Sequence, residues 1–232
     1  MQDLFRSFKV VDLTHTLAPH IPTWNGSCGF CLEIKKDYDK CFRVQQIKMH
    51  AGLGTHMDAP SHRFQEGISI ADIPLDTLIA PICLIDVSQK AHSDYEVCLD
   101  DLQHYEKLHG KIDSRSLVIT YTGWERFWGN TSAYRNIDAQ RQMHFPAVSK
   151  EVAEVLLERE IAGLAIDTLS PDCLDLTFPV HKLLLGQGKY IIENIAHASL
   201  LPPKGSYAIA LPLKAEQATE APLRIIALVP KT

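Results

Sequence analysis

The chain has 232 residues, of which 46% are hydrophobic and 22% charged, and its formal net charge is -5. This balance is typical of a globular protein with one sizeable core, and the absence of a basic run argues against a nucleic-acid partner. No segment reaches the roughly 18 consecutive apolar residues that a membrane span needs, and the first residues lack the apolar core of a signal peptide, so we expect a cytoplasmic protein with no membrane partner.

The predicted elements are mostly strands. Apolar alternation or continuous apolar runs predict strands over 9–14, 30–38, 41–50, 79–87, 116–123, 163–167 and 189–195, with two more inside 207–230. The strands 30–38 and 41–50 are expected to form a hairpin. Turn-forming residues predict a loop over 20–29 and irregular backbone over 51–64.

Three segments have helical spacing: 98–109, ended by Gly110; 149–160, capped by Ser149; and 178–188. Many strands and few helices predict a strand-rich, mixed α/β protein with a large, partly antiparallel sheet, in one domain over 1–232. An α+β arrangement is the alternative.

The six cysteines are scattered along the chain. Cys28 and Cys31 form a Cys-x-x-Cys pair, but a redox or zinc-binding role would need a reactive helix start or a second such pair. Neither is present in the sequence. We therefore interpret the cysteines as reduced thiols of a cytoplasmic protein.

The segment GTHMDAPSH, residues 54–62, concentrates groups that can bind a metal or move a proton. If its first part is extended, His56 and Asp58 point to the same face, because strand side chains alternate. An imidazole and a carboxylate together suit zinc, manganese or iron(II) better than calcium or magnesium. Pro60 then redirects the chain and leaves His62 for proton transfer. The alternative is a polar turn whose histidines are only hydrogen-bonded.

A second group follows at His181, at the start of the predicted helix 178–188, and at Glu193, inside the apolar strand KYIIENI. A buried carboxylate must be paired or bound to a metal, unless Glu193 faces solvent from an edge strand. The two groups together can hold one divalent metal with an open position, or two metals bridged by a carboxylate. Such a centre activates water, which predicts a hydrolase.

These residues resemble the cyclase-like metal-dependent hydrolases, which include bacterial kynurenine formamidase and isatin hydrolase. The pattern His-x-Gly-Thr-His-x-Asp-x-Pro-x-His of that family is similar to GLGTHMDAPSH here. Further matches in the same order are DLTHTL, TGW at 122–124, IDTLSPD at 166–172, FPVH at 178–181, IEN at 192–194, LPP at 201–203, LPLK at 211–214 and the AP-x-R that ends at Arg224.

The resemblance implies a β/β/α cyclase-like fold and a dimer or tetramer of this chain. It implies that His56, Asp58, His181 and Glu193 bind zinc or manganese, one or two ions per chain. It also implies that His62 is the general acid/base. Trp24 matches a position that lines the substrate pocket; the alternative is that this loop tryptophan is a packing anchor.

One position departs from the family pattern. The first histidine of the pattern falls on Gly52, and His50 lies two residues earlier. Either His50 swings in as a replacement ligand, since the intervening glycines are flexible, or the chain has a thinner ligand set and prefers one metal. We favour the second interpretation.

The function implied is hydrolysis of a small amide, either N-formyl or cyclic. A lactone or ester hydrolase, or a lyase, on the same scaffold is the main alternative. A non-catalytic metal- or ligand-binding protein is favoured only by Gly52. A structural zinc protein is the weakest interpretation, because the cysteines avoid the motifs.

Overall fold

The computed structural model describes residues 4–27 and 29–231, so Cys28, one half of the Cys-x-x-Cys pair, lies outside the described residues. Five described cysteines are free thiols, namely Cys31, Cys41, Cys83, Cys98 and Cys173. Within the described ranges, no helix is both long enough and apolar enough to cross a membrane.

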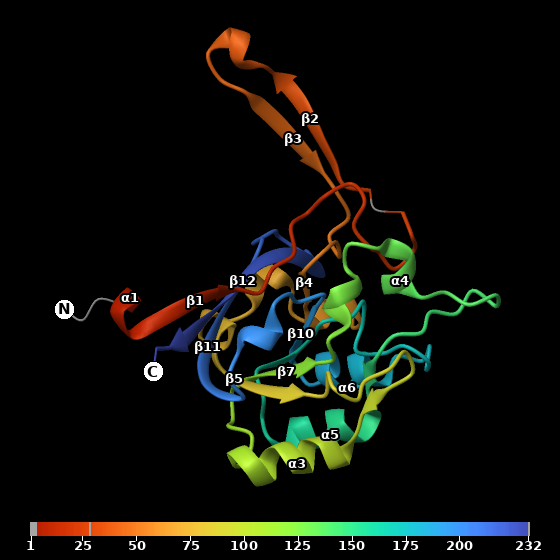
Figure 1. Ribbon diagram of the computed structural model, residues 1–232. Coiled ribbons are helices and arrows are strands. Elements are labelled where there is room, and N and C mark those ends of the chain that lie inside the picture. The colour runs from red at the N-terminus through yellow and green to blue at the C-terminus, as the bar shows by residue number, and fades with distance from the viewer. Residues whose placement is uncertain (1–3, 28, 232) are drawn as a thin grey trace.

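One large sheet organises the molecule, and its strands close into a ring (Figure 1). The strand order is β1-β12-β11-β5-β7-β9-β10-β4, and β4 pairs in addition with β12. The second pairing joins the far edge of the sheet back to β12. The strands of this sheet are β1 (Phe8–Asp12), β4 (His56–Asp58), β5 (Ile79–Asp86), β7 (Leu117–Tyr121), β9 (Gly163–Ile166), β10 (Tyr190–Glu193), β11 (Lys204–Pro212) and β12 (Glu220–Pro230).

The strands β5, β7, β9 and β10 run parallel to one another, whereas the other pairings in the sheet are antiparallel. Their sequences are nearly continuous apolar runs, as expected for parallel strands that are covered on both faces. Leu117 and Ile119 of β7 point into the ring, where they join one hydrophobic cluster. Val118, between them, points outward into a second cluster. The ring therefore has a packed interior and a packed outer face.

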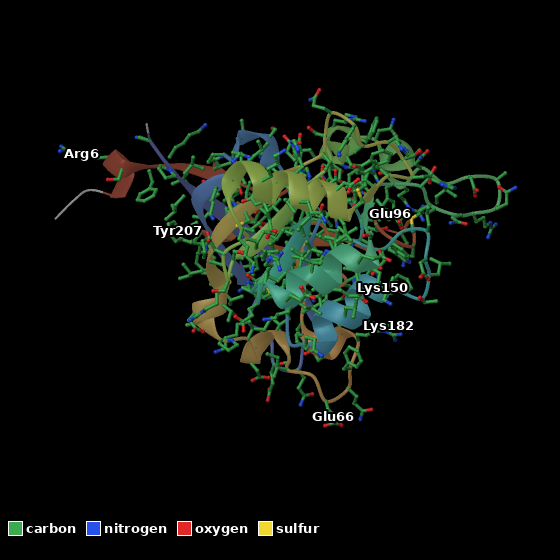
Figure 2. All side chains as sticks on the ribbon, turned by 90° about the horizontal axis from the view of Figure 1, so that it is seen from below. Arg6, Glu66, Glu96, Lys150, Lys182 and Tyr207 are labelled. Carbon is green, nitrogen blue, oxygen red and sulfur yellow. The ribbon has the colours of Figure 1, made fainter. Side chains whose placement is uncertain are left out.

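Helices cover the outer face of the parallel strands. The helices α3 (Leu99–His109), α5 (Lys150–Glu158) and α6 (Pro179–Gly186) supply Leu102, Leu156 and Leu184 to the outer cluster. Figure 2 shows this layer from below, with Lys150 of α5 and Lys182 of α6 at its solvent side. The remaining elements are short: α1 (Leu4–Ser7), α2 (Leu75–Leu78), α4 (Thr131–Arg135), the pair β6 (Glu96–Val97) and β8 (Ala147–Val148), and 3₁₀ turns at Tyr38–Lys40, Pro60–His62, Ile70–Asp72, Trp124–Phe127 and Ala198–Leu200.

A two-stranded hairpin projects away from the ring, as the orange ribbon in Figure 1 shows. It consists of β2 (Cys31–Lys36) and β3 (Val44–Lys48), paired antiparallel with Leu32 opposite Ile47. Every residue of both strands is exposed. The predicted hairpin is therefore confirmed, and it lies outside the main core.

The prediction of a strand-rich, mixed α/β fold is confirmed, as are the strands and the three helices predicted from spacing. The expectation of irregular backbone throughout 51–64 is wrong over His56–Asp58, which form β4. This strand has only three residues, and its local sequence gives little indication of a strand. It is a strand because β10 and β12 pair with it on either side.

Candidate metal centre

The short strand β4 places two of the predicted ligands on the outer face of the ring. Met57 points into the ring interior, so His56 and Asp58 point outward, because strand side chains alternate. In β10, Glu193 lies directly opposite His56. In β12, Glu220 lies directly opposite Asp58. Residues opposite each other share a face, so the register of three strands gathers these four side chains.

The fifth donor, His181, comes from the first turn of α6 above this face. The carboxylate of Asp172 accepts hydrogen bonds from the backbone N–H groups of Val180 and His181, each at 3.0 Å. These are N–H groups that the start of a helix leaves without partners. Asp172 Oδ2 also lies 2.7 Å from His181 Nδ1. One carboxylate therefore fixes both the helix start and the imidazole.

The four predicted ligands surround a common point. His56 Nε2 lies 3.4 Å from Glu193 Oε2 and 3.6 Å from Asp58 Oδ1. His181 Nε2 lies 3.5 Å from Asp58 Oδ2 and 3.5 Å from Glu193 Oε1. Atoms bound tetrahedrally at about 2.1 Å from zinc lie about 3.4 Å apart. Asp58 Oδ1 is buried and has no hydrogen-bond partner. The donor spacing and this unpartnered oxygen fit a bound divalent cation.

Both histidines are oriented through Nδ1. His56 Nδ1 lies 2.9 Å from the carbonyl oxygen of Gly54, which can only accept, so Nδ1 carries the proton and Nε2 keeps its lone pair. Gly54 adopts a φ of +68°, a conformation that favours glycine. The side-chain amide of Asn194 donates to the same carbonyl at 3.0 Å. The backbone of this loop is thereby fixed behind the imidazole.

The space between these donor atoms favours positive charge. Burial opposes protonation of His56, but the carboxylates of Asp58 and Glu193 outweigh it and raise the pKa of His56. Burial likewise opposes protonation of His181, but Asp172, Asp58 and Glu193 raise its pKa well above the ordinary value. Burial raises the pKa of Glu193. A cation held by these carboxylates meets the same favourable field.

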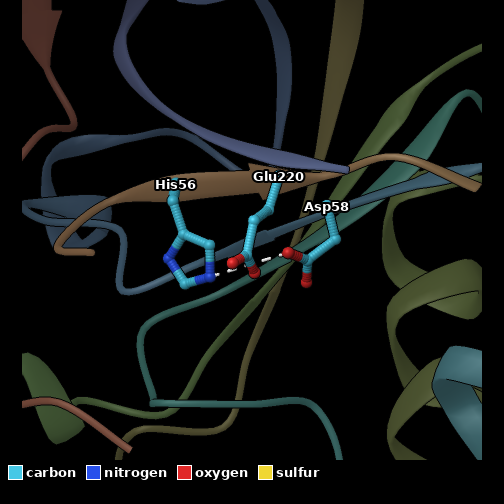
Figure 3. A group of neighbouring side chains, drawn as sticks. All are labelled: His56, Asp58 and Glu220. Atoms are coloured by element: carbon cyan, nitrogen blue, oxygen red, sulfur yellow. Dashed lines mark ion pairs between the residues drawn. The ribbon is translucent and has the colours of Figure 1, made fainter. Parts of the chain in front are cut away.

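Glu220 is a further donor that the sequence did not predict (Figure 3). The donor atoms fall into two groups, each within 4.8 Å: His56, Asp58 and Glu220, and Asp58, His181 and Glu193. Asp58 belongs to both. Glu220 lies in the polar segment KAEQATEAP, where no local pattern separates it from its neighbours. Asp172 was also missed as a positioning group, although it falls inside the matched motif IDTLSPD.

The donor groups form the floor of a cavity of about 700 Å³. Trp24 lies on its wall, with its ring centroid 5.9 Å from that of Phe178. His62 lies at the edge of the floor, 37% exposed, with Nδ1 3.3 Å from Glu220 Oε2. It belongs to neither donor group among the described residues. This position separates His62 from the ligand cluster while leaving it beside the floor.

His50 also lines the cavity, but the structure does not bring it into either donor group formed by the described residues. Its imidazole instead packs against Gly29, where an added Cβ would lie 2.6 Å from the ring. The space next to Gly52, the position at which the family pattern has histidine, is taken by the carboxylate of Glu220.

Comparisons with known proteins agree along the chain. The family model Cyclase, described as "Putative cyclase", matches residues 11–173. Isatin hydrolase of Roseibium aggregatum is 32% identical over 245 residues, which cover 96% of this chain and 92% of the relative. Kynurenine formamidase of Bacillus cereus is 27% identical over 220 residues, which cover 93% of this chain and 95% of the relative.

Solved structures of isatin hydrolases are similar to this chain over nearly its whole length. Isatin hydrolase A from Ralstonia solanacearum superposes with a TM-score of 0.89 at 31% identity, over 96% of this chain and 92% of that chain. An isatin hydrolase bound to the product analogue thioisatinate gives a TM-score of 0.91 at 29% identity, over 98% of this chain and 95% of that chain.

Proposed function

The chain belongs to the Cyclase family, and on that basis we propose that it is a metal-dependent hydrolase of small amides, N-formyl or cyclic. One observation carries the proposal: four buried donors with matching spacing form the floor of an open cavity. Its relatives named isatin hydrolase and kynurenine formamidase support amides as the substrate class.

His56, Asp58, His181 and Glu193 would hold the metal. When bound, a divalent metal lowers the pKa of a water molecule and polarises a carbonyl group. Asp58 and Glu193 supply the negative charge that retains the cation, and both are buried, so solvent screens them little. Zinc and manganese are the metals we propose, because imidazole suits zinc and carboxylate suits manganese.

His62 is the proposed general acid/base. Its Nδ1 faces Glu220, which leaves Nε2 free to take a proton from the attacking water and return it to the leaving nitrogen. The ring centroids of His62 and His181 lie 6.3 Å apart, which places His62 beside the ligand cluster. Proton transfer by such a group typically contributes about 10² to 10⁴ in rate.

The cavity wall supports a planar, partly apolar substrate. Trp24, Leu176 and Phe178 supply its apolar and aromatic surface, and Arg63 and Asn25 also line the cavity. We propose that Trp24 contacts the substrate. Three substrates should be assayed first: isatin as a cyclic amide, one N-formyl aryl amide, and one lactone of similar size. Faster hydrolysis of the lactone than of both amides would contradict the proposal.

We expect His62→Ala and Asp58→Ala to fail in different ways. The first variant should keep its metal and lose about 10² to 10⁴ in rate. The second should lose metal and activity together, because a ligand shared by both donor groups is removed. Metal content per chain and amide hydrolysis, measured on the same preparations, separate the two. A metal-free His62→Ala protein would refute the role given to His62.

Two further expectations belong to this proposal. The free thiols of the described cysteines favour a reducing compartment, and we propose the cytoplasm. We also propose that the chain forms a homodimer or a larger homo-oligomer, supported by the uncovered hairpin β2–β3. The small-molecule substrate remains the only other partner proposed.

A further inference from the structure

We propose that Glu220 is a metal ligand of this chain, seated in the space that Gly52 leaves open. The inference rests on the proposed metal-dependent function and adds a donor that the sequence pattern does not contain. It is carried by the register of β12 on β4, by the surroundings of Gly52 and by an unpartnered oxygen of Asp58.

Strand pairing places Glu220 beside two of the predicted ligands. Glu220 lies opposite Asp58 across the β4–β12 pairing, so its side chain shares the outward face of His56 and Asp58. One donor atom from each of these three residues lies within 4.8 Å of the others. Figure 3 shows the carboxylate of Glu220 directed between the imidazole of His56 and the carboxylate of Asp58.

The Glu220 carboxylate also fills the space beside Gly52. A Cβ added at Gly52 would lie 2.5 Å from Glu220 Oε2, 2.8 Å from its Cδ and 3.1 Å from its Oε1. A side chain at position 52 would therefore displace the Glu220 carboxylate from its observed position. The Glu220 carboxylate lies where a side chain from position 52 would begin. Gly52 is thus a condition for this placement of Glu220 rather than a lost ligand.

Asp58, the residue opposite Glu220, has an unsatisfied oxygen. Asp58 is 1% exposed, and its Oδ1 has no hydrogen-bond partner. Two carboxylates held on one face with a buried, unpartnered oxygen repel each other unless a cation lies between them. Because a carboxylate has two oxygens, Glu220 can face His62 with one and bind the cation with the other. The group of His56, Asp58 and Glu220 is therefore a complete three-donor set.

A glutamate donor in place of a histidine donor also changes which metal the site prefers. An oxygen replaces the imidazole nitrogen that the family pattern places at position 52. Carboxylate donors suit manganese, whereas imidazole donors suit zinc. This chain should therefore favour manganese over zinc more strongly than a variant with histidine at position 52 and no carboxylate at 220.

The test is calorimetric titration of metal-free protein with Mn²⁺ and, separately, with Zn²⁺. We expect Glu220→Gln to lose one equivalent of Mn²⁺, or about a hundredfold in affinity, since loss of even an outer partner commonly costs about 10- to 100-fold. Glu216→Gln is the matched control, because it removes the same charge from an exposed position on the loop before β12. It should leave both titrations unchanged.

Two compensating substitutions distinguish metal binding by Glu220 from a purely structural role of Glu220. Gly52→His alone should weaken Mn²⁺ binding, because the new side chain displaces the Glu220 carboxylate. Adding Glu220→Gly to Gly52→His should restore binding, with a greater gain for Zn²⁺ than for Mn²⁺. Thermal unfolding of each metal-free variant shows whether it is folded.

Two results would overturn the inference in distinguishable ways. If wild type binds metal and Glu220→Gln binds it with the same stoichiometry and affinity, Glu220 only orients His62 and the proposed function stands. If wild type binds neither metal, the proposed metal-dependent function fails together with the role of Glu220.

Discussion

His15 is a neutral imidazole held against an aromatic ring. It stacks on Trp128, with ring centroids 4.0 Å apart and planes 9° from parallel. Its Nε2 is buried without a hydrogen-bond partner. Burial, followed by repulsion from His197, lowers the pKa of His15 to about 4. The folded protein therefore resists protonation at this ring.

We expect His15→Phe to reduce the loss of stability on acidification. The ordinary pKa of histidine is 6.5, so between about pH 6.5 and pH 4 the unfolded chain binds a proton that the folded chain does not. Stability is present above that range and is lost as the pH falls through it, by at most about 3 kcal/mol for this shift. Phenylalanine keeps the stack and cannot take the proton.

Thermal unfolding from pH 7 to pH 4 measures this difference. The melting temperature of wild type should fall more steeply than that of His15→Phe. Parallel curves for the two proteins would mean that the imidazole of His15 is not held neutral.

The ligands that the sequence predicts are those whose neighbours in the chain mark them as unusual. His56 and Asp58 share a face because they are two apart in a strand, and Glu193 is conspicuous as a carboxylate in an apolar strand. Glu220 has no such local signal. Its place follows from strand pairing with a segment 162 positions away in the sequence, from Asp58 to Glu220. Tertiary pairing of this kind cannot be deduced from one residue's neighbours.

At the scale of elements, the helices α5 and α6 begin with different caps. Ser149 Oγ accepts from the N–H of Val152 at 3.3 Å and makes none of the described hydrogen bonds to the proposed metal ligands. Asp172 caps α6 and also faces the Nδ1 atom of His181. The two caps therefore offer a matched comparison.

We expect Ser149→Ala and Asp172→Ala each to lower stability by about 1 kcal/mol through the lost cap. Only Asp172→Ala should also weaken metal binding, by about 10- to 100-fold, because His181 loses the partner that orients its ring. Urea unfolding and metal titration of both variants measure the two effects. Equal metal affinity in the two variants would contradict the orienting role of Asp172.

Element prediction succeeded where the hydrophobic period was long and failed where a neighbour decided the structure. The strands β5, β7 and β9 and the helix α5 carry unmistakable apolar patterns. The strand β4 has three residues and lies among glycines, and only its two partners make it a strand. The element least visible in the sequence therefore carries two of the proposed ligands.

At the scale of the whole molecule, the hairpin has one uncovered apolar face. Leu32, Ile34 and Ile47 share this face and are 46%, 49% and 57% exposed. A two-stranded hairpin is marginally stable in water, and closed symmetric pairs of identical chains are the commonest oligomers. We therefore propose that a second copy of this chain covers this apolar face in the homo-oligomer.

We expect the double substitution Leu32→Lys with Ile47→Lys to reduce the oligomer to a monomer, because it places charges on the apolar face. Glu33→Lys with Gln46→Lys is the control, since this pair occupies the opposite face at the adjacent register position. Sedimentation velocity gives the mass of each protein. A control variant that dissociates equally, or a wild type that is already monomeric, would refute this role of the hairpin.

The closure of the ring by β4 and β12 has a consequence for synthesis. The pairing joins residues 56–58 to residues 220–222, so a nascent chain emerging from the ribosome exposes His56 and Asp58 long before their last partner strand exists. Loop closure over so long a segment is slow compared with local folding. The full donor set therefore matures after translation of β12, and a chain released before that strand is made lacks both the closed ring and Glu220.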